Sequence, residues 1–322
     1  PLARLIHGKT LGNPFFVNQF LRVLHQDGLL NFEAGRWVYD LAEIEARGIT
    51  DNVVSLMTQK IEELGQPTQR ALSLAAAVGN VFELNTLAAA AGSSAGVVAD
   101  DLWEALAEGY LVPLDDGYRI VGIKTGETGA QVEPVLADDQ GDFNPRYRFL
   151  HDRVQQAAYS FIPEEERPRT HLRIGRAMRE LLDDEALDDQ LFNVVDQLER
   201  GVSQVTDPTE RTELARLFAR AGDKARLASA HEPALKYFSG AQELLGETLW
   251  TSNYEIGQPV LFQRSGSEYL LGNFDAAEAL FDELVDKSRT DLEKAQIYRL
   301  KLSLYQSRGL FLETVDIAYK GL

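Results

Sequence analysis

From Asp152 to the end of the chain, the sequence shows a helical pattern that no strand pattern interrupts. Apolar residues recur at intervals of three and four over 154–161, 172–182, 191–198 and 214–230, which is the spacing of a helix with one apolar face. Each such helix must bury its apolar face against another element. The pattern therefore predicts a mostly α-helical chain whose C-terminal half is a stack of helices.

Three stretches of that half share a spacing of small and aromatic residues: 229–241, 272–284 and 309–321. In the second stretch, Gly272, Ala277 and Phe281 follow the spacing of the second helix in a tetratricopeptide unit. The stretches start 43 and 37 residues apart, against about 34 in regular repeats of this kind. We therefore predict a degenerate TPR-like α-solenoid over 163–322, with these small residues between paired helices. An ordinary antiparallel stack of helices is the alternative.

Residues 1–64 are expected to form a small helical domain. Apolar residues between 15 and 30 have helical spacing, and Gly28 follows as a stop signal. The four residues at 36–39 favour a short strand, and Asp51 can cap a further helix.

Residues 65–162 show the order of elements found in a winged helix, with three helical patterns before two strand signals. The helices are expected at 67–77, 84–91 and 95–109, and the strands at 111–114 and 118–121. Asp-Gly turn chemistry separates the two strand signals, as in a hairpin. Residues 122–145, rich in Gly, Asp, Thr and Pro, are expected to form a mobile insertion in the wing, after which 147–149 is again extended.

The charge of the chain argues against several functions. Lys and Arg number 32 against 50 Asp and Glu, a net charge of -18, which opposes binding to nucleic acid and to anionic lipid. The predicted recognition helix at 95–109 has acids and no Lys or Arg: Asp100, Asp101, Glu104 and Glu108. The chain has no Cys and no apolar run of the roughly 18 to 20 residues that a membrane span needs. We expect a cytoplasmic protein with no nucleic-acid or membrane partner.

Two short motifs resemble catalytic signatures but lack the required context. Gly8-Lys9-Thr10 resembles the end of a phosphate loop, but Ala3 stands where that pattern needs Gly, and no strand precedes it. The segment 92–96 matches G-x-S-x-G but joins two Ala-rich helices, so Ser94 is expected to be a helix N-cap. The five His residues show no metal-ligand spacing. We therefore expect no catalytic residue and no metal site in this chain.

Two further segments carry a resemblance to a known family. One is Gly12-Asn13-Pro14-Phe15-Phe16-Val17, which opens a helix, and the other is the segment 149–159 around Leu150-His151-Asp152. With 49–54 and 161–165, they resemble the C-terminal part of STAND signalling ATPases, which are AAA-related switch proteins. The chain is most similar to bacterial regulators that place a serine/threonine kinase domain before the ATPase and helical repeats, then often GAF and histidine-kinase domains, after it. The resemblance covers nearly the whole chain.

The resemblance implies a nucleotide site. In such ATPases a Gly-x-Pro signature lies at the sensor-2 position of the helical lid, where the Pro packs near adenine, and Gly12, Asn13 and Pro14 match it. The winged helix of the family carries a Met-His-Asp motif whose His reaches the β-phosphate of ADP, and His151 matches it, with Leu150 in place of Met. Taken singly, Gly12 to Pro14 is an ordinary helix start with Pro at N1, and His151 is an ordinary half-buried His. Their order and context favour the nucleotide interpretation.

The resemblance also implies an organisation and a function. Residues 1–64 would be the lid, 65–162 the winged helix and 163–322 the helical arm of a switch. Its ATP- or ADP-binding core would precede Pro1, since the chain has the features of a segment cut from a larger polypeptide. The segment would be no enzyme, although its parent would be an ATP-binding kinase or ATPase, and the repeats would bind protein partners. The alternatives are a TPR-like adaptor without nucleotide coupling and a winged-helix transcription regulator.

Overall fold

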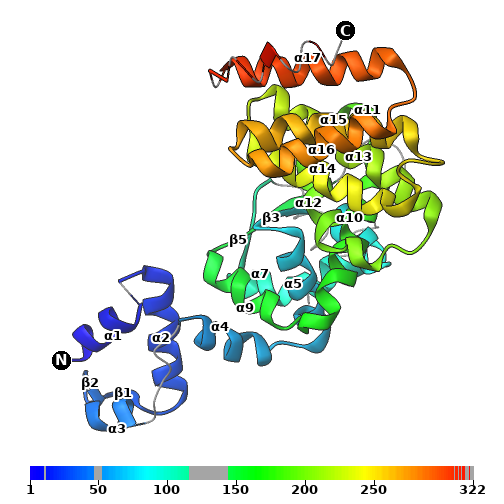
Figure 1. The fold of residues 1–322 in the computed structure, drawn as a ribbon. Helices are drawn as coiled ribbons and strands as arrows, with labels where there is room; N and C mark the ends of the chain where they lie inside the picture. The colour runs from blue at the N-terminus through cyan, green and yellow to red at the C-terminus, as the bar shows by residue number, and fades with distance from the viewer. Residues whose placement is uncertain are drawn as a thin grey trace. The chain divides into compact units, whose positions relative to one another are not determined.

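The computed structural model describes residues 1–10, 12–46, 53–115 and 144–307, together with 309, 310, 312, 314, 315 and 319. The chain is mostly α-helical, as predicted, and its strands are few and short (Figure 1). It divides into two compact units, Pro1–Ala177 and Met178–Leu322.

The first part of unit 1 consists of short elements: α1 (Leu2–Thr10), α2 (Pro14–Gln26), β1 (Leu30–Glu33), β2 (Arg36–Tyr39), α3 (Leu41–Ala46) and α4 (Val53–Glu62). The predicted helix before Gly28 and the predicted strand at 36–39 are present as α2 and β2. Strand β1 was not predicted, because Leu30 continues the apolar spacing of α2. In the structure Leu30 is instead the first residue of β1 and pairs with Tyr39 of β2 in an antiparallel hairpin. Asp51, the predicted helix cap, lies outside the described residues.

The rest of unit 1 contains the three predicted helices, but a strand that was not predicted, β3 (Val81–Glu83), lies between the first and the second. Its elements are α5 (Gln66–Val78), β3, α6 (Leu84–Ala91), α7 (Ala95–Ala107), β4 (Leu111–Pro113), β5 (Arg146–Phe149) and α9 (Asp152–Ser160). The strands form an antiparallel sheet in the order β3-β5-β4. Phe82 on β3 stacks on Tyr147 of β5 at 5.7 Å between ring centroids, and both rings are buried. The sheet therefore joins residues on both sides of the segment predicted to be the wing.

Only part of the predicted wing falls within the described residues. The expected strand at 118–121 and residues 122–143 of the expected insertion lie outside the described residues. The last two residues of that insertion bond to the start of α6 instead: Asn144 Oδ1 accepts a hydrogen bond from the Asn85 N–H at 2.9 Å, and the Pro145 carbonyl accepts one from the Leu84 N–H at 3.0 Å. The insertion thus ends before Asn144.

Unit 2 is a series of helices that pack consecutively. They are the end of α10 (Arg167–Leu181), α11 (Asp184–Asp189), α12 (Leu191–Arg200), α13 (Pro208–Leu227), α14 (His231–Leu245), α15 (Tyr254–Leu270), α16 (Phe274–Lys287) and α17 (Asp291–Ser307), with short 3-10 turns at Val202–Gln204 and Gly246–Thr248. A further 3-10 turn, Glu164–Glu166, precedes α10 in unit 1. From α13 to α17 each helix contacts the next, and α15 also contacts α13 and α17. The division between the units falls inside α10, beyond the predicted domain boundary at 162. The Tyr159 hydroxyl lies 2.8 Å from Nε2 of His171 and ties the start of α10 to unit 1.

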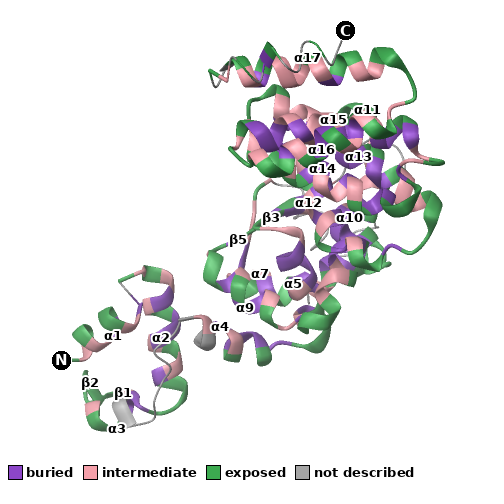
Figure 2. Cartoon of the chain, viewed as in Figure 1, coloured by how far each residue is buried: buried purple, intermediate pink, exposed green. Residues whose placement is uncertain are grey.

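The helix faces that meet one another hold the apolar core, as Figure 2 shows by colour. Ala277 and Phe281 are fully buried, as predicted from the repeat spacing. Gly272 is exposed, so its predicted place between helices was wrong: it follows the end of α15 with φ +85, a conformation that glycine adopts most easily. Most of the third predicted repeat stretch, 309–321, lies outside the described residues.

Replacing Ala277 by Leu is expected to destabilise unit 2 by about 1–3 kcal/mol, since the larger side chain has no free volume at a fully buried position. Urea unfolding followed by circular dichroism measures the effect. The matched control is Ala276→Leu, one residue earlier on the exposed side of α16. Equal stability of the two variants would contradict the assigned helix face.

Asp188 connects α11 to α13 through two ion pairs. Its carboxylate accepts hydrogen bonds from Arg220 at 2.7 Å and from Lys224 at 3.0 Å, and these bonds lower the pKa of Asp188 below its ordinary value of 3.8. A lowered folded-state pKa adds stability above pH 3.8 that is lost as the pH falls through the folded value. Asp188→Asn should therefore lower stability at pH 7 and lower it less at pH 3. The same loss at both pH values in thermal melts would rule out the ionic cause.

Candidate functional site

The two segments that carry the family resemblance come together in unit 1. The Phe16 ring, in the first turn of α2, lies edge-on to the His151 imidazole, with 4.5 Å between ring centroids and 65° between ring planes. Phe16 is buried, while 31% of the His151 side chain is exposed. A helix start and a histidine far apart in the sequence are therefore neighbours.

Local backbone geometry positions each predicted residue on the α2 side. Gly12 has φ +76, and its N–H donates to Thr10 Oγ1 at 3.3 Å as the chain turns out of α1. A side chain here would also crowd His7, since an added Cβ would lie 3.2 Å from Cδ2 of that ring. Asn13 is the N-cap of α2 and accepts from the Phe15 N–H at 3.0 Å, and Pro14 fills N1, where its missing N–H costs nothing. The predicted helix start is thus confirmed, and nucleotide binding by Gly12, Asn13 and Pro14 stays a prediction.

His151 is the N-cap of α9. Its Nδ1 accepts from the Arg153 N–H at 3.1 Å, and the same nitrogen contacts the Asp152 carboxylate. When the ring is neutral and Nδ1 accepts, the proton sits on Nε2, and when the ring is charged both nitrogens carry protons. With Nδ1 accepting from the Arg153 N–H, Nε2 of His151 carries the proton of the neutral ring, and no described residue accepts from it. The ring can donate one hydrogen bond to a ligand oxygen.

The other two sequence motifs have structural roles. Gly8, Lys9 and Thr10 form the last turn of α1 and not a loop, and Ser94 caps α7 by accepting from the Val97 N–H at 3.4 Å, as predicted. Within the described ranges, no three His, Cys, Asp or Glu side chains group as metal ligands would, and no helix is both long and apolar enough to cross a membrane.

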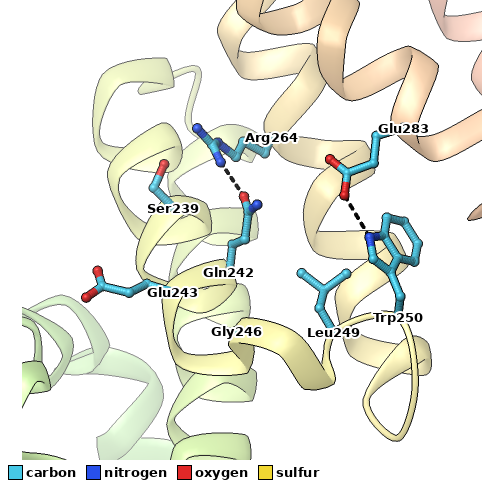
Figure 3. Close-up of a pocket in the computed structure, with 8 residues that line it drawn as sticks. All are labelled: Ser239, Gln242, Glu243, Gly246, Leu249, Trp250, Arg264 and Glu283. Atoms are coloured by element: carbon cyan, nitrogen blue, oxygen red, sulfur yellow. Dashed lines mark hydrogen bonds between the residues drawn. The ribbon is translucent and has the colours of Figure 1, made fainter.

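Unit 2 contains a hollow of about 410 Å³ that sequence reasoning missed (Figure 3). Its lining comes from α14, the turn that follows it, α15 and α16: Ser239, Gln242, Glu243, Gly246, Leu249, Trp250, Arg264 and Glu283. The indole Nε1–H of Trp250 donates to Glu283 Oε1 at 2.7 Å, and the Arg264 guanidinium donates to Gln242 Oε1. No local motif marks these residues, because three helices and a turn each supply only a few of them.

Comparison with known proteins gives one distant relative. The chain is 26% identical over 356 aligned residues to hybrid signal transduction histidine kinase G of Dictyostelium discoideum, and the match covers all of this chain. The chain spans a tenth of that protein's length. No family model matches the chain, and no solved structure matches it. The similarity supports a signalling role.

Proposed function

We propose that this chain is the non-catalytic regulatory part of a signal-transduction ATPase of the STAND type. Residues 1–64 close over the nucleotide as a lid, 65–162 form a winged helix, and the helices of 163–322 present a surface to protein partners. The packing of Phe16 on His151 carries the proposal. It brings the two segments that match the family's nucleotide motifs to one place.

The geometry suggests how the switch works. The N-termini of α2 and α9 both lie at this contact, and helix N-termini favour anions. His151 Nε2 donates to a phosphate oxygen of ADP, a bond to a charged group of about 1.5–3 kcal/mol. Loss of ADP removes that bond and favours a second state, in which α2 and α9 separate and Phe16 becomes exposed.

Two observations bear on the alternatives. The similarity to a signal transduction histidine kinase favours signalling over transcription regulation, as does the acidic α7, which carries Asp100, Asp101 and Glu104 and no Lys or Arg. A repeat adaptor without nucleotide coupling remains the second candidate, because the helices of unit 2 fit both functions.

His151→Ala in the full-length parent is expected to lower the affinity for ADP by about tenfold to a hundredfold, because the variant loses the hydrogen bond from Nε2. Isothermal titration calorimetry measures the affinity. His25→Ala is the matched control: His25 bonds to the Leu30 carbonyl at 2.8 Å, beside the β1–β2 hairpin. If both variants bind ADP as the parent does, the adaptor without nucleotide coupling is the better interpretation.

A further inference from the structure

The hollow in unit 2 points to the chemistry of a partner. We propose that it binds an arginine or lysine side chain from a basic segment of a partner protein. The inference rests on the partner-binding half of the proposed function and not on the nucleotide site. An experiment can therefore disprove this inference without disproving the proposed nucleotide switch.

Trp250 and Glu283 form a prearranged pair for a cation. The indole N–H holds one oxygen of the Glu283 carboxylate at 2.7 Å, and both residues are half-buried. No cationic side chain of the described chain lies within ion-pair distance of Glu283. The structure thus sets a carboxylate that lacks a cation at the N–H edge of an indole, where the hydrogen bond fixes its position.

The charge of the hollow also favours a cation. Glu243 on α14 and Glu283 on α16 both line it, although Figure 3 shows the Glu243 carboxylate turned away from the other lining side chains. Neither carboxylate has an ion pair with a described residue. Arg264, the basic residue of the lining, is already paired with Glu268 at 3.2 Å. A ligand in the hollow therefore meets the Glu283 carboxylate, whose charge no described residue neutralises.

The same arrangement disfavours an anion. A carboxylate or phosphate that approached Arg264 would compete with the buried Glu268 and with Gln242 for the two terminal nitrogens of its guanidinium. Unit 2 as a whole has sixteen Lys and Arg against twenty-six Asp and Glu, so its field attracts basic segments and repels acidic ones. Leu249, on the floor of the hollow, offers apolar surface to the methylene stem of Arg or Lys.

The test uses the intact 322-residue chain with ¹⁵N-labelled tryptophan. The probe is a short arginine-containing peptide, and a second peptide replaces each arginine by citrulline, which has a similar shape and no charge. We expect the arginine peptide to shift the Trp250 indole signal saturably and to leave Trp37 and Trp103 in place. The citrulline peptide should shift none of them.

Matched variants separate a site from general attraction to an acidic surface. Glu283→Gln keeps an acceptor for Trp250 and should weaken the arginine peptide about tenfold. Glu247→Gln removes the same charge from the exposed neighbouring turn and should change the affinity less than about twofold. The proposal would be overturned by any of three results. The two variants could lower the affinity equally, the arginine peptide could shift all three indole signals, or a glutamate peptide could shift the Trp250 signal.

Discussion

Replacing Phe16 by Ala is expected to destabilise the contact between α2 and α9 by about 3–5 kcal/mol, the usual cost of removing a buried phenyl ring. Phe16 is buried, and its ring contacts both Phe15, at 5.2 Å between centroids, and His151. Hydrogen exchange measured by mass spectrometry should show faster exchange over 14–26 and 152–160. Under the proposed function, the variant should also weaken ADP binding by the longer protein, because His151 loses the ring that it packs against.

Phe32→Ala is the control for this prediction. Phe32 lies in the same unit, but 59% of its surface is exposed, so its removal should change stability by less than about 0.5 kcal/mol. If the Phe16→Ala and Phe32→Ala variants show the same hydrogen exchange over 14–26 and 152–160, this contact does not hold the two motif segments together. The argument for a shared nucleotide site would then lose its structural basis.

The sequence predicted long elements well because their apolar faces repeat over several turns. Helices such as α13 and α16 contain enough turns for helical spacing to stand out from chance. Strand β3 has three residues, too few to show alternation, and it forms because Arg148 on β5 pairs with Val81. Short strands are fixed by partners distant in the sequence, which a local pattern does not reveal.

The candidate sites differ in how far the sequence could reveal them. Gly12 to Pro14 and His151 were found through a family resemblance, and no spacing rule relates a helix start to a histidine so far along the chain. The hollow beside Trp250 had no such resemblance to reveal it. Its two principal side chains, Trp250 and Glu283, meet because α14, α15 and α16 pack in series. That contact depends on how closely the helices approach one another.

Close helix approach in unit 2 depends on two reciprocal glycine–phenylalanine contacts between α13 and α14. A Cβ added to Gly222 would lie 2.5 Å from the Phe238 ring, and one added to Gly240 would lie 2.7 Å from the Phe218 ring. Both rings are almost fully buried, so neither can move aside without opening the core. Each glycine thus provides the space that the opposite ring fills.

Gly222→Leu should therefore destabilise unit 2 by about 3 kcal/mol, at the upper end of the cost of overpacking. This cost outweighs the gain of up to about 1 kcal/mol from replacing a helical glycine. Urea unfolding monitored by circular dichroism measures the difference. Gly96→Leu is the control, because Gly96 lies in α7 with nothing within 4 Å of an added Cβ, and it should be neutral or stabilising.

A second substitution tests the cause of that loss. If the clash with Phe238 is responsible, Phe238→Ala should cost less in the Gly222→Leu background than in the parent chain, because the leucine fills part of the space that the ring leaves. Additive losses would show that the two residues do not interact. The close approach of α13 and α14 would then need another explanation.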